Sequence, residues 1–551
     1  MTRQAWWRVA SLGSLILLAL GATITSIGHD FTFDDRYVIL TNGHVHELRN
    51  LLRLFRETYW PRELGGDGYR PIVMALFTIQ WVAAHGKPWI FHLFNILLAV
   101  ATSVAVWWCA SALLPEAAAW MAAALFAVHP VHVEVTGNVV GQSELLVALL
   151  LSLAVGVYLR GRRAGWLRPR DSALVLALYA AALLAKEHAI VLPALLFVAE
   201  LTVIHDPDRR ARWRAARPFA LLLVAVSVTY LYVRGLVQSD LAGFVPFPMF
   251  RFLHMTALDR AATMMTEVPR IARLLVFPTH LSGDYSPTEV VVQRGFDVIQ
   301  IPGIVICVGA LVLALVLRRR APVSSFGLLW VIISFVPVSN IFVPAGFVTA
   351  ERTLFFPSVG IVLIAGDIVA RALAARRVLV RRSTLAAVAI LLALGLARSI
   401  DRQRVWKNND IFFDQLVKDE PNGYRAHFLR GRNIGSQYRL RERELEYKHA
   451  LRLFPYDVAM MLAIAADYYR GGFCEPTVVL LSWSYAVQSD IGDGRYQYAE
   501  CLGRLGRWQE SRTAALNGLR LAFPRDSRGL RLVLARADSA LGRSRGRRPA
   551  R

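Results

Sequence analysis

Long apolar runs recur along this chain and constrain its fold more than any other feature. Runs of about 17 to 24 residues follow one another from the N-terminus to about residue 399, and no such run occurs afterwards. A run of this length is what an α-helix needs to cross a bilayer, and a helix satisfies its backbone hydrogen bonds internally. The sequence therefore predicts an all-α fold: a polytopic membrane body followed by a tail of about 150 residues.

Eleven of these runs are predicted to span the membrane. A further segment, 70–84, has about 15 residues and is short for a crossing. A cleaved signal peptide is the alternative for the first run, but that run is long and lacks a clear small-residue cleavage site. The predicted spans lie at about 5–27, 89–113, 117–133, 142–159, 171–186, 188–205, 216–238, 301–317, 323–345, 354–371 and 382–399.

Arginine-rich loops decide the orientation of the spans. Four clusters lie at 160–170, 209–217, 318–320 and 371–382. With the N-terminus inside, all four are cytoplasmic only if 70–84 does not cross, as the positive-inside rule requires. The sequence therefore predicts a re-entrant or interfacial helix at 70–84. The same clusters account for the net charge of +23 without a nucleic-acid partner.

This topology gathers unusual polar residues on the extracytoplasmic face. They lie in the acid pair 34–35 and in the segments "HPVHVEVTGNVVGQSE" (129–144), "AKEH" (185–188), "GDYS" (283–286) and "AERT" (350–353). Ionisable residues at membrane ends are candidates for function, although long side chains also snorkel to the interface without one.

The adjacent carboxylates Asp34 and Asp35 directly follow the first run. Their repulsion raises the pKa of one of them, which makes it a candidate general base for a hydroxyl acceptor. The pair can instead bind a divalent cation with other acids, or cap a turn.

Three cations on the same face are candidates for binding a phosphate. Arg352 offers a planar fork that makes two parallel charge-assisted bonds. Lys186 offers a point charge, and Arg70 heads the 70–84 segment. Ion pairing with neighbouring side chains is the alternative for Lys186 and Glu187.

His129, His132 and Glu134 form an H-x-x-H-x-E pattern. Imidazoles three residues apart on a helix share a face and can hold a metal, but Pro130 interrupts this segment. We therefore expect the imidazoles to bind a phosphate or orient a carboxylate, or simply to pack at a span end. No metal or other cofactor is required, although a divalent cation is compatible with the acids.

The tail carries a repeat. Pro421, Pro455 and Pro524 are separated by 34 and 69 residues, and Asp490 takes the intermediate place. This is the tetratricopeptide period of helix–turn–helix units, which stack into a solenoid that binds a protein partner. Alanines are expected to mark the close packing of each second helix: Ala450, Ala486, and Ala514 or Ala515. Cys474 and Cys501 are expected to be buried thiols, with a disulfide as the alternative.

The motifs and their order resemble a known family. The segments "FTFDDRYVILTN", "YRPIVMALFTIQW", "FHLFNILLAV", "HPVHVEVTGNVVGQSELL", "AKEHAIVLPALL", "LLVFPTHLSGDYS" and "AERTLFFPSVG", with the repeat tail, are similar to transmembrane-and-tetratricopeptide-repeat O-mannosyltransferases and their bacterial relatives. The resemblance implies a GT-C glycosyltransferase fold and a polyprenyl-phosphate sugar donor. It also implies catalysis on the periplasmic or lumenal face, in a plasma, inner or endoplasmic-reticulum membrane.

The resemblance also assigns roles. It implies that Asp34 and Asp35 are catalytic, and it maps a Lys-Glu pair on Lys186 and Glu187 and a Glu-Arg pair on Glu351 and Arg352. We expect the phosphate to bind Arg352, Lys186 and Arg70. The expected supporting residues are His129, His132, Glu134, Glu187, Glu351 and Asp284.

Two departures from the family pattern bear on the sugar and the donor head group. Gln142, Ser143 and Glu144 stand where the family has Arg-Ala-Asp, and Thr353 stands where a tyrosine usually follows Glu-Arg.

The predicted organisation has four parts: a membrane body (1–400), an amphipathic segment at the membrane surface (401–420), extracytoplasmic repeats (421–541) and a basic tail (542–551). The predicted function is transfer of a sugar from the lipid donor to a hydroxyl, expected on protein Ser or Thr, with the repeats recruiting the acceptor or another protein. Three alternatives stay open: a non-catalytic scaffold anchored in membrane lipids, a lipid-linked sugar transporter, and an enzyme whose acceptor is a glycan or lipid.

Overall fold

The computed structural model describes residues 3–62, 66–165, 167–204, 209–238, 255–434, 439–521 and 524–545. Most residues of these ranges are helical, and their only extended pairings are two isolated bridges, which confirms the predicted all-α class. The chain divides into two compact units. The first comprises 1–246 and 256–421, and the second comprises 247–255 and 422–551.

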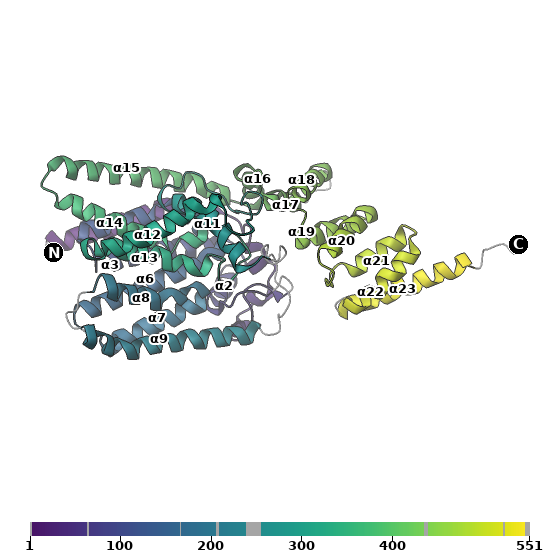
Figure 1. Ribbon diagram of the computed structural model, residues 1–551, viewed down its shortest axis with the longest axis horizontal. Coiled ribbons are helices and arrows are strands. Elements are labelled where there is room, and N and C mark those ends of the chain that lie inside the picture. Colours follow the sequence, from purple (N-terminus) through teal and green to yellow (C-terminus); the bar gives the residue numbers. More distant parts are fainter. Residues whose placement is uncertain are drawn as a thin grey trace. The chain divides into compact units, whose positions relative to one another are not determined.

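The first unit is a bundle of long helices that run side by side (Figure 1). Residues 28–88 form the segment that the topology predicts to be the first external loop. Its short helices, with α2, gather at one end of the bundle, and the N-terminus lies at the other (Figure 1). The helices are α1 (Arg3–Thr23), α2 (Pro71–Ala83), α3 (Trp89–Ala110), α4 (Glu116–Ala127), α5 (Val133–Gly137), α6 (Gln142–Arg163), α7 (Pro169–Ala185), α8 (Leu192–Thr202), α9 (Arg209–Gln238), α11 (Ala257–Val276), α12 (Ile301–Arg320), α13 (Pro322–Phe335), α14 (Ser358–Ala374), α15 (Val378–Gln403) and α16 (Asn409–Asp419).

Each predicted span contains a helix, but the helices α4, α8 and α13, of 12, 11 and 14 residues, are shorter than the spans predicted at 117–133, 188–205 and 323–345. Six helical segments among the described residues are long and apolar enough to cross a membrane, or seven if the bent pair α4 and 130–137 counts as one. The total of eleven spans therefore stays a prediction. α2, in the segment predicted to be re-entrant, has 13 residues.

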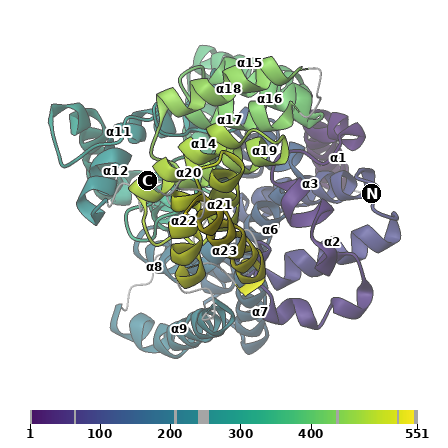
Figure 2. The ribbon, with the colours of Figure 1, turned by 90° about the vertical axis from the view of Figure 1, so that its right-hand side faces the viewer.

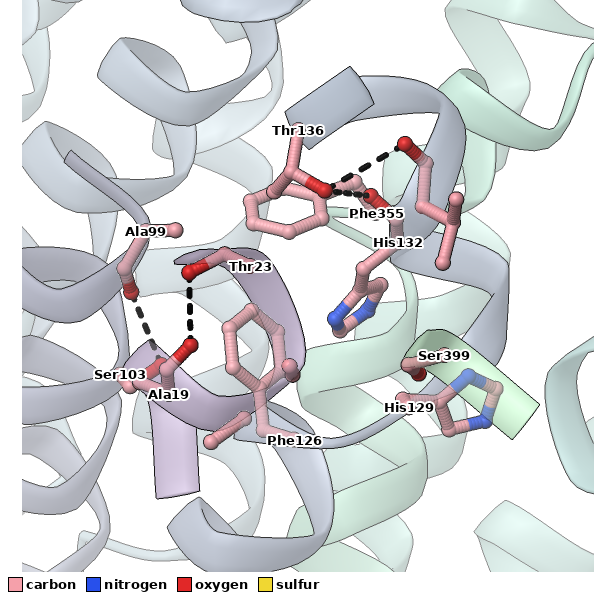
Figure 3. Close-up of a pocket in the computed structure, with 13 residues that line it drawn as sticks. Ala19, Thr23, Ala99, Ser103, Phe126, His129, His132, Thr136, Phe355 and Ser399 are labelled. Atoms are coloured by element: carbon pink, nitrogen blue, oxygen red, sulfur yellow. Dashed lines mark hydrogen bonds between the residues drawn. The ribbon is translucent and has the colours of Figure 1, made fainter. Parts of the chain in front are cut away.

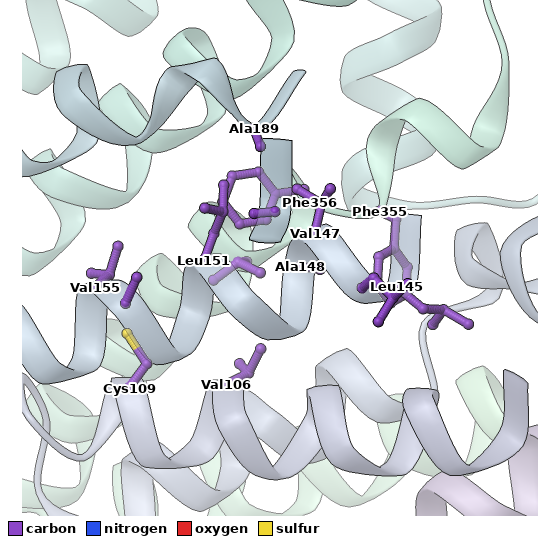
Figure 4. Close-up of a cluster of buried hydrophobic side chains, with 14 of the residues drawn as sticks. Val106, Cys109, Leu145, Val147, Ala148, Leu151, Val155, Ala189, Phe355 and Phe356 are labelled. Atoms are coloured by element: carbon purple, nitrogen blue, oxygen red, sulfur yellow. The ribbon is translucent and has the colours of Figure 1, made fainter. Parts of the chain in front are cut away.

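Helix α6 lies in the middle of the bundle and packs against α3, α7 and α8 (Figure 2). Val106 and Cys109 of α3 face Leu151 and Val155 of α6 in its apolar core (Figure 4). By contrast, only 11% of the most apolar stretch of α9, and likewise of α15, is buried inside the protein. Apolar surface on this scale suits contact with lipid rather than water.

The segment that follows α15 packs on protein. Trp406, Phe412 and Leu416 are buried, and Phe412 lies so close to Gly283 that a Cβ at that glycine would be 2.5 Å from its ring. Ile411 remains exposed. The amphipathic pattern correctly predicts a helix, but the predicted location at the membrane surface is wrong for these three side chains.

The described residues of the second unit form three helix pairs and a final helix: α17 (Tyr424–Asn433) and α18 (Leu440–Leu453), α19 (Val458–Arg470) and α20 (Cys474–Val487), α21 (Arg495–Arg504) and α22 (Trp508–Leu521), then α23 (Pro524–Arg545). Residues 546–551 of the predicted basic tail lie outside the described residues. The assignment of these pairs as tetratricopeptide repeats stays a prediction.

Two expectations for this unit are corrected. Cys474 and Cys501 form a disulfide with a Cα–Cα distance of 4.9 Å, so they are not free thiols. Ala450 and Ala515 are buried as predicted, but Ala486 is not buried, and Ser484 is buried two residues earlier. In α20, therefore, the helix face that packs on the core is not the one that the repeat pattern predicts.

Candidate functional site

The two adjacent carboxylates have different surroundings. The side chain of Asp35 is fully buried and accepts hydrogen bonds from the backbone N–H groups of Thr32, Val139 and Val140, at 3.1, 3.1 and 2.8 Å. Burial raises the pKa of Asp35 to about 7, although the three donors oppose that rise. Asp35 thus ties the segment 28–88 to the short turn before α6, and its buried side chain is not placed to reach an acceptor.

Asp34 lies on the accessible side of the pair. Its side chain is 16% exposed, and its Oδ2 is 3.8 Å from Nη2 of Arg352. Of the two residues expected to be catalytic, only Asp34 therefore remains a candidate. Asp35 instead fixes the loop that carries Asp34.

Arg352 is fixed from its other side by Glu134. Glu134 accepts from the backbone N of Arg352 at 2.7 Å and from its Nη1 at 2.5 Å. The guanidinium also lies 5.0 Å from the centroid of the Phe347 ring. A guanidinium has five N–H donors, so these contacts orient Arg352 and leave donors for a ligand.

Lys186 and Glu144 form a buried ion pair, and His188 Nε2 lies 3.4 Å from the second oxygen of Glu144. Beside them, Gln142 and Gln80 exchange two hydrogen bonds of 2.9 Å. Gln142 and Glu144, two of the residues that depart from the family pattern, are therefore buried and paired within the protein.

Arg70 pairs with Glu187. The guanidinium lies 3.2 Å from Oε2 of Glu187, and the other carboxylate oxygen accepts from the backbone N of Tyr69. The two arginines, Arg70 and Arg352, both act electrostatically on Lys186. Each of the three predicted phosphate-binding cations is thus oriented by a carboxylate, both arginines act on Lys186, and Arg352 lies beside Asp34.

Of the roles predicted for the two histidines, packing at a span end is the one that their contacts match. Nε2 of His132 is 2.8 Å from the hydroxyl of Ser358, and Nε2 of His129 is 3.1 Å from the carbonyl of Leu275. Both rings line a cavity of about 20 Å³ among α1, α3, α5 and α15, enough for about one water molecule (Figure 3). Pro130 starts a short 3-10 turn, so the histidines do not share a regular helix face.

Glu351 lies in a second polar group beside the site. Its Oε1 accepts from the hydroxyl of Tyr285 at 2.8 Å and from the backbone N of Ser282 at 2.6 Å. Burial raises the pKa of Glu351 to about 8. Asp284 is buried in the same loop, and its carbonyl accepts from the Ser282 hydroxyl at 3.1 Å. Both residues support the loop architecture next to Arg352.

The first external loop holds a larger cavity of about 360 Å³. Its polar lining includes Arg53, Glu57 and Thr58, and Arg53 Nε donates to Glu57 at 3.0 Å. No group of three His, Cys, Asp or Glu side chains suited to a metal ion occurs in the described parts of the chain.

Sequence reasoning missed Tyr59. It is 2% exposed, and its phenol interacts electrostatically with Arg70, Asp34, Asp35 and Arg352. No motif of the sequence marks it, because its position depends on the fold of the external loop.

No family model matches this chain. It is 27% identical over 367 residues to the human protein O-mannosyl-transferase TMTC3, a match that covers 61% of this chain and 40% of that protein. It is 26% identical to human protein O-mannosyl-transferase TMTC4, covering 78% of this chain and 64% of that one, and 24% identical to protein O-mannosyl-transferase F38B6.6 of Caenorhabditis elegans, covering 81% and 63%. The chain therefore spans about half the length of these relatives.

A solved structure of the archaeal oligosaccharyltransferase AglB from Archaeoglobus fulgidus, in complex with an inhibitory peptide and a dolichol-phosphate, matches with a TM-score of 0.45 and 14% identity, covering 83% of this chain and 61% of that one. The Archaeoglobus fulgidus oligosaccharyltransferase tethered to an acceptor peptide matches with a TM-score of 0.41 and 13% identity, covering 82% and 59%. By its sequence, the chain is similar over most of its length to the TMTC protein O-mannosyl-transferases.

Proposed function

We propose that this protein is an integral membrane glycosyltransferase that moves a sugar from a polyprenyl-phosphate donor to a hydroxyl acceptor, expected on protein Ser or Thr, at the extracytoplasmic face. One observation carries the proposal. An accessible carboxylate, Asp34, lies against Arg352, with Lys186 and Arg70 close by. A general base beside a cluster of cations suits attack by a hydroxyl on a sugar whose leaving group is a phosphate.

The reaction is a single displacement. Asp34 takes the proton of the acceptor hydroxyl, and the oxygen forms a bond to the anomeric carbon as the bond from that carbon to the phosphate oxygen breaks. Inversion at the anomeric carbon is expected. The lipid monophosphate leaves with the electron pair, Arg352, Lys186 and Arg70 stabilise its growing charge, and Asp34 later gives its proton to water.

The disulfide supports an extracytoplasmic location for the second unit, because such bonds persist in oxidising compartments and are rare in the cytosol. In this proposal, the helix pairs of the second unit recruit the acceptor protein or another partner. The orientation from the arginine clusters puts the acid pair and the second unit on the same side.

The test is transfer by purified protein in lipid, from a set of polyprenyl-phosphate sugars to Ser- and Thr-containing peptides, for wild type and Asp34→Asn. We expect lipid phosphate release and sugar transfer by the wild type, and donor binding without turnover by the variant. Transfer to glycans or lipids but not to peptides would change the acceptor. No turnover with any donor or acceptor would leave the membrane-anchored scaffold as the function.

A further inference from the structure

The phenol of Tyr59, in the predicted first external loop, differs from the other buried tyrosines in the surroundings of its hydroxyl. Six tyrosines of the described chain are at most 2% exposed: Tyr59, Tyr69, Tyr179, Tyr285, Tyr424 and Tyr447. Five of them form a hydrogen bond through the hydroxyl: Tyr69 with the carbonyl of Phe55, and the other four with the side chains of Ser227, Glu351, Asp457 and Asp467.

The hydroxyl of Tyr59 is the exception: among the described residues it has no hydrogen-bond partner. Burying a hydroxyl without a partner destabilises a protein. An orphaned donor in a charged site therefore points to a ligand that completes it.

The Tyr59 ring is held firmly. The guanidinium of Arg70 lies 4.4 Å from the ring centroid, in a cation–π contact. The backbone N of Tyr59 donates to the carbonyl of Gly68 at 2.9 Å, and the next residue, Trp60, donates to Asp67 at 2.9 Å. Gly68 has a φ of +77°, and a Cβ there would lie 3.2 Å from Cβ of Tyr59 and 3.3 Å from Oε1 of Glu187. The loop therefore fixes the ring where it is.

The charges around this phenol define the ligand. Two cations, Arg70 and Arg352, and two acids, Asp34 and Asp35, act on it electrostatically, and Arg70 also contacts its ring. Burial raises its pKa, so the phenol remains a donor at any physiological pH. A neutral donor beside two guanidinium groups suits an anionic oxygen, and hydrogen bonds to charged groups are the strong ones.

We propose that the Tyr59 hydroxyl binds a phosphoryl oxygen of the lipid donor, alongside Arg70 and Arg352. This assignment rests on the proposed function, because that function supplies the lipid phosphate. Tyr59 would then be a binding residue that the donor completes, and its hydroxyl would release the phosphate when the product leaves.

The test compares Tyr59→Phe with Tyr69→Phe in full-length protein in nanodiscs. Tyr69 is the matched control: it lies in the same loop and is also 2% exposed, but its hydroxyl donates to the carbonyl of Phe55 at 3.0 Å. Binding of polyprenyl monophosphate and of inorganic phosphate is measured, together with Tm in the absence of ligand.

We expect Tyr59→Phe to bind polyprenyl monophosphate about tenfold more weakly than the wild type, with an unchanged or higher Tm. Tyr69→Phe should have a lower Tm and unchanged affinity. Tighter binding of the lipid form than of inorganic phosphate, with both weakened in Tyr59→Phe, supports the phosphoryl contact. Equal affinity of wild type and Tyr59→Phe would overturn it, and so would a drop in Tm as large as that of Tyr69→Phe.

The readout separates the two proposals. Wild type that binds polyprenyl monophosphate in a Tyr59-dependent way but transfers no sugar would overturn the proposed function and keep the Tyr59 assignment. If the wild type transfers sugar and Tyr59→Phe binds the donor and reacts normally, the Tyr59 assignment is overturned and the proposed function is kept.

Discussion

Glu134 holds Arg352 by two bonds at once, one to the backbone N at 2.7 Å and one to Nη1 at 2.5 Å. The residues are 218 positions apart in the sequence. Glu134 therefore sets both the path of the chain at Arg352 and the direction of its guanidinium.

Glu134→Gln is expected to lower kcat/KM about 100-fold, because a misdirected catalytic group costs about this much. The glutamine keeps an acceptor for the backbone N but loses the ion pair. The measurement is steady-state transfer from the lipid donor.

Glu200→Gln is the matched control for Glu134→Gln. It breaks another buried pair, in which Nε of Arg162 lies 2.6 Å from Oε1 of Glu200. Arg162 is about 27 Å along α6 from Glu144. If both variants lower activity equally, Glu134 acts through stability alone.

Asp34→Asn and Asp35→Asn are expected to fail in different ways. Asp34→Asn should lower kcat by about 10²- to 10⁴-fold, the usual contribution of a general base, with little change in Tm. Asp35→Asn replaces one acceptor oxygen by an amide that opposes backbone donors, so it should destabilise the fold by about 1–3 kcal/mol. Thermal unfolding and turnover, measured side by side, distinguish them. An Asp34→Asn variant with full activity would remove Asp34 as the base.

Lys186→Met is expected to destabilise the protein by about 3–5 kcal/mol, because it leaves the buried Glu144 carboxylate without its cation. Adding Glu144→Leu should restore most of the stability, since both charges are then gone. If Lys186 binds the donor phosphate, the double variant stays inactive although it is folded. Recovery of activity with stability would show that Lys186 only neutralises Glu144.

Stability is expected to depend on pH through Glu351. Burial raises its pKa to about 8 in the folded state, whereas an unfolded glutamate titrates near 4.3. The folded state therefore binds the extra proton between these values, and stability falls as the pH rises from about 4.3 to 8.

Glu351→Gln should remove part of this pH dependence. The variant should match the wild type near pH 5 and have the higher Tm near pH 9, because the amide carries no charge there. Thermal unfolding over this pH range makes the comparison. Parallel Tm curves for the two proteins would contradict the assignment.

Removal of the disulfide is expected to lower the free energy of unfolding of the second unit alone. Cys474→Ser with Cys501→Ser opens a bond between residues 27 positions apart, and we expect a loss of about 2–4 kcal/mol. Limited proteolysis of the full-length protein should then cut within 422–551 while the membrane body stays intact. Two alkylatable thiols at these positions in the untreated wild type would show that the bond is absent.

The sequence predicts where the helices lie and at which end of the bundle the site lies, because these two features depend on local composition. Apolar length locates each helix, and arginine-rich loops assign the faces. The gathering of Asp34, Arg352, Lys186 and Arg70 follows from those two signals.

The partners within the site could not be predicted, because they depend on how distant segments pack. Although Asp34 and Asp35 are neighbours in sequence, Asp35 is buried against the backbone donors of Thr32, Val139 and Val140, whereas Asp34 is partly exposed beside Arg352. The two histidines turn away from a common helix face because Pro130 replaces a regular helix by a tight turn. The membrane-surface prediction for Trp406 and Phe412 fails because an apolar helix face has the same periodicity whether lipid or protein covers it.

The chain that leaves α15 also supports the acid pair. The carbonyl of Lys407 accepts from Asp30, that of Trp406 accepts from the hydroxyl of Thr32, and the side chain of Asn409 accepts from the backbone N of Phe33. These three hydrogen bonds fix the position of the residues immediately before Asp34. The segment after α15 therefore also stabilises the predicted first external loop. A truncation meant to remove only the C-terminal helix pairs has to begin after residue 419, where α16 ends, so that this support is kept.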